Sequence, residues 1–415
     1  MHKIMIRPIA IHAKNYKAYK KIDLDISKMN IFIGKNSAGK SALTRLIPMI
    51  LKSLNLTNGN VLDFSPLDID IAATYQDLVH GHKEYTKLEL GATFDCEGII
   101  INFITELRYS TELSQLVVSK FSCSYDEVCF NAEMDLEELE SNNNLRYFVE
   151  DEFTLLDFDG LIPSGHNLPV KHLNTFELLD KIKNYNFNLS YLGPFRSELN
   201  RTYTSKIIKN YDIGDRGQNA PYVFNDLEKK SNGLLGEKIK KWMQINFNGK
   251  YFSIKSLGQS FSVYCISEHN ESNIIDEGMG FAQVFPSIVN RNVRDLKSID
   301  GIEIIEQPEL HIHPAACGIV ADLYLEAKDS NIILIETHSK EFVLRVRRRI
   351  AEGINNKDVN LVYVDYDMEN RTACLKPIEI NKNGSVSWWP SGIFEEDFEE
   401  VIAINNAGGN DENQM

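Results

Sequence analysis

Eight residues near the start of the chain have the types and spacing of a phosphate-binding loop. Gly34-Lys35-Asn36-Ser37-Ala38-Gly39-Lys40-Ser41 matches the pattern GxxxxGK[ST] over its full length. Glycine permits the backbone angles that wrap N–H groups around phosphates. In this pattern the lysine neutralises the outer phosphates and the hydroxyl of Ser41 binds Mg²⁺. The segment therefore predicts a site for a nucleoside triphosphate, with ATP and Mg²⁺ as the expected cofactors.

A second segment, IEIIEQPELHIHP at residues 302–314, places acidic side chains after a short apolar run. Glu306 ends the run, where a carboxylate helps to hold Mg²⁺. The next residue, Gln307, cannot accept a proton at neutral pH, although an amide can orient an attacking water. Glu309 follows Pro308 and is the alternative base. The residues leave open whether Gln307 or Glu309 places the water, or whether the chain holds ATP without hydrolysing it.

Short buried strands must position these groups. Residues 29–33 form an apolar run typical of a buried strand, and a helix is expected after the loop, with its positive end at the anion. Alternating apolar residues at 22, 24 and 26 favour a strand before the loop, paired with an earlier one in a hairpin. A further apolar strand in NIILIETHSKEF, residues 331–342, runs into Glu336 and His338.

The segment IHAKNYKAYKKIDLDISKMNIFIGKNSAGKSAL, residues 11–43, resembles the N-terminal lobe of ABC-type ATPases of the SMC, RecF and OLD group. The resemblance implies an α/β P-loop NTPase fold of the ABC-ATPase type with an antiparallel β-subdomain. Because no long heptad stretch lies between the phosphate loop and residue 276, no long coiled coil is expected. The resemblance also implies that the chain is an ATPase, and a slow one.

The resemblance assigns roles to several residues. DEGMGFAQVFPSIVN at 276–290 occupies the place of the ABC signature motif, where Gly278, Gly280 and Gln283 match and Ala282 replaces the more usual serine. Since that motif reaches ATP held by another protomer, a homodimer or higher oligomer is expected. His338 matches the switch histidine near the γ-phosphate.

Other candidate positions have a structural alternative. Gln76 matches the nucleotide-sensing Q-loop position, or is a solvent-facing residue before a strand. His311 and His313 suggest a metal site with Glu309, but OLD-like ATPases carry a similar HLHP without one. Asp365 and Asp367 imitate a nuclease metal pair, but we interpret them as a strand followed by a turn.

Closer similarity is seen to an OLD-like subgroup that resembles the ATPase subunits of phage-defence systems such as Septu and PARIS. It is carried by YLGPFRSELNRTY, IEQPELHIHP, IETHSKEFVLRVRRRI and WPSGIF. In that subgroup the Glu-Gln pair is the rule, which implies a retained activity. The resemblance implies that ATP turnover gates a separately encoded effector, a nuclease or toxin. A non-hydrolysing scaffold and a RecF-like DNA-binding ATPase are the alternatives.

Bulk composition limits the possibilities further. Of 415 residues, 43% are hydrophobic and 25% charged, which is ordinary for a globular protein. No run reaches the ~18 apolar residues of a membrane span, and six scattered cysteines favour reduced thiols in the cytoplasm. A net charge of −15 does not favour nucleic acid as a partner, although it does not prevent binding through a local basic patch.

The expected organisation is one ABC-type ATPase domain over residues 1–400. A nucleotide-binding lobe is expected at about 1–80 and 190–380, a β-rich insertion at about 81–189, and a disordered tail at 401–415. The acidic stretch 126–159 is either a solvated surface or a docking site for a basic partner. The arginines of RVRRR are placed on a helix whose buried side is Leu344, Val346 and Ile350. They form either a solvated face or a contact surface for DNA phosphates or a protein partner.

Overall fold

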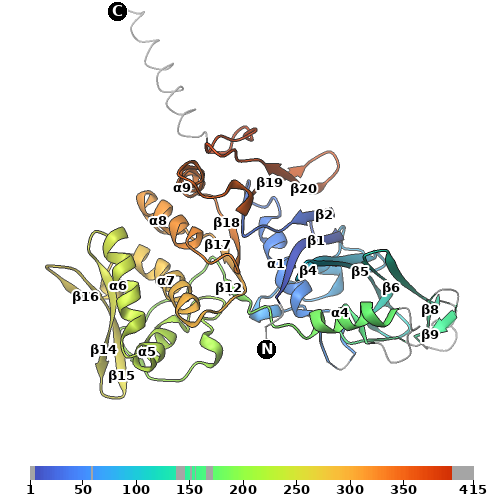
Figure 1. The fold of residues 1–415 in the computed structure, drawn as a ribbon, viewed down its shortest axis with the longest axis horizontal. Coiled ribbons are helices and arrows are strands. Elements are labelled where there is room, and N and C mark those ends of the chain that lie inside the picture. The colour runs from blue at the N-terminus through green and yellow to red at the C-terminus, as the bar shows by residue number, and fades with distance from the viewer. Residues whose placement is uncertain are drawn as a thin grey trace, which may run out of the picture.

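The computed structural model describes residues 5–57, 59–136, 145–149, 152–154, 156–164 and 172–394. The expected tail and the middle of the acidic stretch lie outside these residues. Figure 1 shows two layers of helices and strands on opposite sides of a central sheet.

The central sheet carries the segments with candidate chemistry. Its strand order is β12-β17-β18-β3-β19-β20, and every neighbouring pair is parallel except β19 with β20. All residues of β3, β17 and β18 are buried, as expected for a parallel sheet covered on both faces. The strands are β12 (Ser190–Leu192), β17 (Ile302–Glu306), β18 (Ile332–Glu336), β3 (Met29–Ile33), β19 (Val359–Asp367) and β20 (Thr372–Ile378). The predicted strands at 29–33, 302–306 and 331–336 are confirmed.

Alternate residues of these strands face two separate hydrophobic cores, because successive side chains of a strand point to opposite faces. Phe32, Ile304 and Leu334 pack with helix α1 (Lys40–Lys52) and the antiparallel sheet. Ile31, Ile305 and Ile333 pack with the helices of the other layer. Those helices are α5 (Ala220–Lys230), α6 (Leu234–Asn246), α7 (Met279–Lys297), α8 (Pro314–Leu325) and α9 (Lys340–Ala351).

An antiparallel sheet forms the second large unit. Its order is β2-β1-β4-β5-β6-β7-β8-β9, so the N-terminal hairpin belongs to this sheet and does not extend the parallel one. The strands are β1 (Ile6–Tyr16), β2 (Tyr19–Asp25), β4 (Leu88–Cys96), β5 (Ile99–Ser110), β6 (Gln115–Tyr125), β7 (Val128–Met134), β8 (Tyr147–Val149) and β9 (Glu152–Thr154). Helix α4 (Leu173–Lys183) packs on it through Phe176, whose ring lies 5.0 Å from that of Phe130. The predicted hairpin is confirmed.

A small third sheet beside α6 was not predicted. It contains β13 (Tyr203–Thr204), β14 (Tyr251–Leu257), β15 (Ser260–Ile266) and β16 (Glu271–Asn273). The remaining elements are short: α2 (Tyr75–Leu78), the pair β10 (Asp157–Phe158) and β11 (Pro163–Ser164), and the 3₁₀ turns at 66–68, 209–211, 274–276 and 356–358. No helix in the described ranges exceeds the 19 residues of α7, so the expected lack of a long coiled coil is confirmed there.

One prediction about α9 is wrong. Its buried side consists of Phe342, Val343, Val346 and Ile350, whereas Leu344 is 45% exposed. Leu344 is two residues, or about 200° of helix rotation, from Val346, so the two side chains point in opposite directions.

Candidate nucleotide site at the strand ends

The loop between β3 and α1 already has the shape that its glycines were expected to allow. Gly34 and Gly39 have φ of 151° and 111°, and a Cβ on Gly34 would lie 2.3 Å from the carbonyl oxygen of Val364. The Nζ of Lys40 donates to the carbonyls of Gly34 and Lys35 at 3.0 and 2.8 Å, inside the loop. Burial lowers the pKa of Lys40, since it disfavours the charged ammonium. The backbone therefore forms a preshaped loop around a buried lysine.

The rest of the loop presents backbone to solvent at the start of α1. Lys35, Asn36 and Ser37 are exposed, whereas Ala38 is buried. Ser37 has a φ of 61°, which turns the chain toward the helix. Helix α1 begins at Lys40, and its unpaired N–H groups give that end a partial positive charge.

The hydroxyl of Ser41 contacts a residue to which the sequence analysis gave no role. Ser41 Oγ donates to Glu336 Oε1 at 3.0 Å, at the end of β18. Glu336 is only 3% exposed, and its second oxygen, Oε2, is buried without a hydrogen-bond partner. Burial, together with repulsion by Glu306, raises the pKa of Glu336 to about 7. The signal available in the sequence was an acid at the end of an apolar strand, two residues before His338.

Both carboxylate oxygens of Glu306 accept hydrogen bonds, in contrast to those of Glu336. It is 1% exposed, and Arg45 binds it through Nε at 2.8 Å and Nη2 at 2.7 Å. Thr44 Oγ1 donates to the same carboxylate at 3.2 Å. The hydrogen bond to Glu306 raises the pKa of Arg45 further, which keeps the guanidinium charged. Both donors come from α1, one turn beyond the phosphate loop, so Glu306 ties β17 to that helix.

Parallel pairing brings the two acids together. Glu306 and Glu336 are register partners in β17 and β18, and the backbone N–H of Gln307 donates to the carbonyl of Glu336 at 2.8 Å. Gln307 has a φ of 47°, an uncommon value for a side-chain-bearing residue. Its amide makes no side-chain hydrogen bond with any other part of the described chain. The backbone of Gln307 is thus fixed by a hydrogen bond, while its side-chain amide is available to hydrogen-bond a ligand or water.

Glu309 and His338 lie against each other at the neighbouring strand ends. Glu309 Oε1 accepts the backbone N–H of His338 at 2.6 Å, and its Oε2 is buried without a partner. Burial raises the pKa of Glu309. Burial, with the nearby charge of Lys40, lowers the pKa of His338 to about 4, so its ring is neutral at pH 7. The neutral imidazole can accept or donate one hydrogen bond without adding charge.

Sequence reasoning also gave no role to Arg196, which lies behind this site. Arg196 is 7% exposed, and its Nη1 and Nη2 donate to the carbonyl of Glu306 at 3.4 and 3.3 Å. Its Nε is buried without a partner, and burial lowers its pKa to about 10. The segment YLGPFRSELNRTY contains it, but nothing in the spacing shows that this loop reaches the end of β17.

The signature-like turn begins α7 and lies beside the HIHP segment. Gly278 is the N-cap of α7, and a Cβ on Gly280 would lie 3.4 Å from the carbonyl oxygen of His311. Met279 between them is 63% exposed, and Gln283 is partly buried one turn later. None of these residues contacts the phosphate loop of its own chain through an interaction recorded among the described residues.

Gln76 lies apart from the strand ends. It is exposed on α2 and its Nε2 reaches Glu84 at 3.4 Å. The pocket that it helps to line is formed by residues 59–62, 64, 73–76, 84, 109 and 115–116, and includes no residue of the phosphate loop. A nucleotide-sensing role for Gln76 gains no support from this placement.

The histidines of HIHP have structural partners. His313 caps α8, where its Nδ1 accepts the N–H of Ala315 at 3.2 Å, and His311 is an exposed residue with a φ of 61°. Asp365 pairs with Lys376, and Asp367 accepts N–H groups of the following turn. Within the ranges that the structure describes, no three His, Cys, Asp or Glu side chains gather as a metal cluster. Mg²⁺ does not require one, because it keeps water and phosphate oxygens among its ligands.

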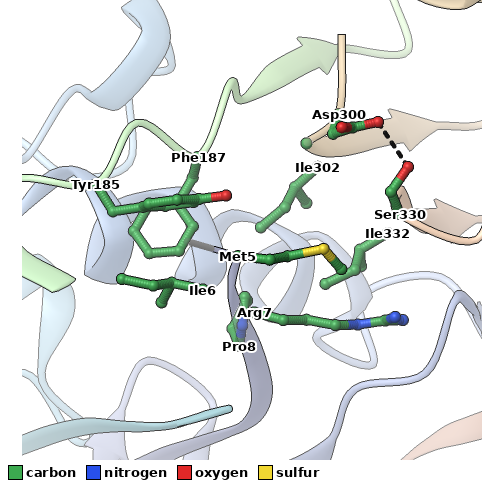
Figure 2. Close-up of a pocket in the computed structure, with 11 residues that line it drawn as sticks. Met5, Ile6, Arg7, Pro8, Tyr185, Phe187, Asp300, Ile302, Ser330 and Ile332 are labelled. Atoms are coloured by element: carbon green, nitrogen blue, oxygen red, sulfur yellow. Dashed lines mark hydrogen bonds between the residues drawn. The ribbon is translucent and has the colours of Figure 1, made fainter. Parts of the chain in front are cut away.

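A pocket at the opposite edge of the parallel sheet does not belong to this site. Figure 2 shows it between the start of β1 and the starts of β17 and β18, with Tyr185, Phe187 and the hydrogen-bonded pair Asp300 and Ser330. In open α/β sheets, ligands bind outside the carboxyl ends of the strands. The phosphate loop, Glu306 and Glu336 all lie at that carboxyl edge.

The basic cluster of α9 is internally paired. Arg345 and Arg349 bind Asp322, and Arg348 binds Glu352. Arg347 Nε donates to the carbonyl of Gly384 at 2.9 Å. The arginines therefore pair with Asp322 of α8, with Glu352 and with the chain after β20, and do not form a continuous surface of unpaired positive charge.

Comparison with known proteins agrees with this arrangement. A family model described as "AAA ATPase domain" matches residues 5–343. An OLD nuclease of Thermus scotoductus is 24% identical over 393 residues, which cover 88% of this chain and 65% of that protein. The chain thus spans about two thirds of the length of this curated relative.

One solved structure shows the same fold. An SMC head bound to the C-terminal winged-helix domain of ScpA superposes with a TM-score of 0.50 at 12% identity, covering 90% of this chain and 98% of that one. The SMC head domain of Thermotoga maritima gives a TM-score of 0.44 at 12% identity, with coverage of 90% and 100%. The predicted α/β P-loop ATPase fold with an antiparallel sheet is confirmed. No described helix is both long and apolar enough to span a bilayer.

Proposed function

This chain belongs to the AAA ATPase domain family, and from that premise we propose that it binds ATP with Mg²⁺ and hydrolyses it slowly. The observation that carries the proposal is the meeting of Lys40 and Ser41 with the acidic ends of β17 and β18. A phosphate loop, a helix N-terminus and buried carboxylates then converge on one edge of the sheet. Phosphoryl transfer needs this combination, because catalysis there is mainly positioning and charge stabilisation.

Each residue has a proposed task in the reaction. Residues 34–41 wrap the phosphates, and Lys40 exchanges its contacts with the loop carbonyls for phosphate oxygens. Ser41 would hold Mg²⁺ through its hydroxyl, and Glu306 would add negative charge to the same site; the ion, when bound, neutralises charge on the phosphates. Water attacks the γ-phosphorus while the bond to the β-phosphate oxygen breaks, giving ADP, inorganic phosphate and a proton.

Gln307 is our proposed water-positioning residue. Its backbone is fixed by the hydrogen bond to Glu336, and its amide is free of other side-chain hydrogen bonds within the described chain. Glu309 is the alternative, since its Oε1 accepts the backbone N–H of His338 while its Oε2 is buried without a partner. We propose that the neutral ring of His338 senses the γ-phosphate, since it is half-buried close to Lys40.

A second copy of the chain would complete the site. Gly280 lies beside the carbonyl oxygen of His311, and within the described residues no hydrogen bond or ion pair joins Gly278, Gly280 or Gln283 to residues 34–41 of the same chain. The exposed Gly278 and Met279 at the start of α7 support a head-to-tail pair in which each signature-like turn faces the partner's ATP. A separately encoded effector, gated by turnover in phage defence, is supported only by the similarity of the motifs.

ATP turnover by the purified protein tests the proposal. Wild type is compared with Lys40→Ala and with Lys52→Ala, a matched control at the exposed far end of α1. Turnover should fall by roughly 10²-fold or more in Lys40→Ala and stay unchanged in Lys52→Ala.

One alternative function has an observation in its favour. Gln307 cannot act as a proton acceptor, so a scaffold that binds ATP without turnover fits the same site. Tight ATP binding with no turnover in wild type would replace the ATPase proposal by this scaffold. Absence of both ATP binding and ATP turnover in wild type would reject both the ATPase and the scaffold.

A further inference from the structure

The end of β18 carries a buried carboxylate whose hydrogen bonding is incomplete. Glu336 is 3% exposed, its Oε1 accepts the hydroxyl of Ser41 at 3.0 Å, and its Oε2 has no partner. Leaving a buried acceptor unsatisfied is costly, and a buried ionised carboxylate is retained where a cation or several donors compensate it. The unpartnered oxygen therefore marks a position that a ligand of positive charge would stabilise.

Within the part of the chain that the structure describes, no cationic side chain contacts Glu336 directly. Lys40 is near enough to influence it electrostatically, but its Nζ donates to the carbonyls of Gly34 and Lys35. Arg45 is engaged with Glu306 through both Nε and Nη2. Among the described residues no ion pair to Glu336 is formed, so a bound cation would give its ionised form the direct contact that these residues do not supply.

Glu306, the acid at the equivalent position of β17, is already satisfied. Its Oε1 accepts from Thr44 and Arg45, and its Oε2 accepts from Arg45. A cation that took Glu306 as a direct ligand would compete with a bidentate arginine pair, which is among the stronger hydrogen-bonded contacts in proteins. Glu336 offers a free oxygen at no such cost.

We propose that Glu336 supplies a carboxylate to the Mg²⁺ site, next to Ser41, while Glu306 stays bound to Arg45 and contributes its charge from there. The inference rests on the proposed function, because the same ion accompanies the nucleotide. Ser41 and Glu336 provide one hydroxyl and one carboxylate, and phosphate oxygens and water would fill the remaining positions. That division is ordinary for Mg²⁺, which is commonly held by one or two carboxylates plus substrate phosphates.

Mn²⁺ binding provides a test that does not depend on turnover. Mn²⁺ replaces Mg²⁺ as a paramagnetic probe, and free Mn²⁺ is counted by electron paramagnetic resonance during titration of the full chain with saturating ADP. Separately, the affinity for a fluorescent ADP analogue is measured in EDTA. The variants are Glu336→Gln, which keeps an acceptor for Ser41 but removes the charge, Glu306→Gln, and the control Glu326→Gln on the far side of α8.

The proposal expects Glu336→Gln to weaken Mn²⁺ binding by roughly 10- to 100-fold, with the affinity for ADP in EDTA unchanged or tighter. Glu306→Gln should weaken Mn²⁺ binding less, and Glu326→Gln not at all. Ser41→Ala combined with Glu336→Gln should lose less than the sum of the two single changes, because both would touch one ion.

Two results would overturn the inference. The first is Mn²⁺ binding in Glu336→Gln equal to wild type while ADP still binds in EDTA. The second is a loss in Glu306→Gln that exceeds the loss in Glu336→Gln. Absence of ADP binding in wild type would instead reject the proposed function. If Glu336→Gln does not fold, as judged by circular dichroism, Glu336→Asp replaces it with the same expected weakening.

Discussion

The carboxyl ends of β17 and β18 lie side by side, and each ends in a glutamate with a different environment. Glu306 is held by three donor contacts from Thr44 and Arg45, whereas Glu336 accepts one hydrogen bond from Ser41 and keeps one oxygen unpartnered. Both side chains are almost completely buried. The comparison indicates that a charge fully paired within the chain maintains the shape of the site, and that an incompletely paired one is available to a ligand.

The largest effect on stability should follow from breaking the ion pair between Glu306 and Arg45. Arg45→Met removes the cation that compensates Glu306 and leaves a buried charge, so the free energy of unfolding should fall by about 3–5 kcal/mol. Urea unfolding in EDTA measures this. Arg348→Met is the matched control: its pair with Glu352 is exposed, and its loss should cost less than about 1 kcal/mol.

A double variant shows whether the loss comes from the stranded carboxylate. Adding Glu306→Gln to Arg45→Met should recover part of the stability, because the unpaired charge is then gone. Equal stability of wild type and Arg45→Met would mean that the pair does not support the end of β17.

The next effect concerns the residues that follow β17. We expect Gln307→Ala to lower ATP turnover by roughly 10²-fold, because misplacement of a reacting group by a small distance costs that much. Glu309→Gln keeps an acceptor for the N–H of His338, so its turnover should change only a few-fold. Single-turnover assays with radiolabelled ATP measure the chemical step, with nucleotide affinity as the control.

Gln307→Glu sharpens this prediction, because it places a carboxylate where the amide stands and should raise turnover. The reverse pattern, with a harmless Gln307→Ala and an inactive Glu309→Gln, would transfer the water-positioning role to Glu309.

A smaller change in stability, in the opposite direction to that of Arg45→Met, is expected at the end of β18. Without metal and nucleotide, Glu336→Gln should be more stable than wild type by about 1–2 kcal/mol at pH 8, because the ionised carboxylate is buried and repelled by Glu306. The pKa of Glu336, about 7, is above its usual value, so the native state binds this proton more tightly than the unfolded state. Its contribution to stability is therefore present at low pH and is lost as the pH rises through about 7.

The advantage of the variant should shrink below pH 7 and vanish below the ordinary pKa of a glutamate. Urea titrations in EDTA at several pH values measure it. A variant that is less stable than wild type at pH 8 would show that the Glu336 carboxylate is itself a structural contact.

Local patterns predicted the elements of the site well. The apolar runs gave β3, β17 and β18, and the GxxxxGK[ST] spacing gave the loop and the start of α1. These features depend on residues close together in the chain, and buried parallel strands read as continuous apolar segments.

Partners distant in the sequence could not be predicted in the same way. Glu306 meets Arg45 across 261 residues, and Ser41 meets Glu336 across 295. Both contacts depend on β18 lying between β17 and β3, and nothing in the local pattern states that strand order. The position of Arg196 behind β17 depends on the same tertiary arrangement.

The smallest effect is expected for the arginines of α9, whose contribution to DNA binding depends on whether their charges are already paired within the chain. Arg347 donates to the carbonyl of Gly384 and Arg348 forms an exposed pair with Glu352, so both have a partner within the chain. At each salt concentration from 50 to 200 mM, charge reversal of both residues should change the affinity for duplex DNA by less than about twofold relative to wild type. Fluorescence anisotropy with a labelled duplex measures this, and Lys229→Glu with Lys230→Glu at the end of α5 supplies a control of equal charge change. A steep loss of salt-dependent binding confined to the arginine variant would show that these pairs open toward phosphate, and would favour a DNA-binding ATPase.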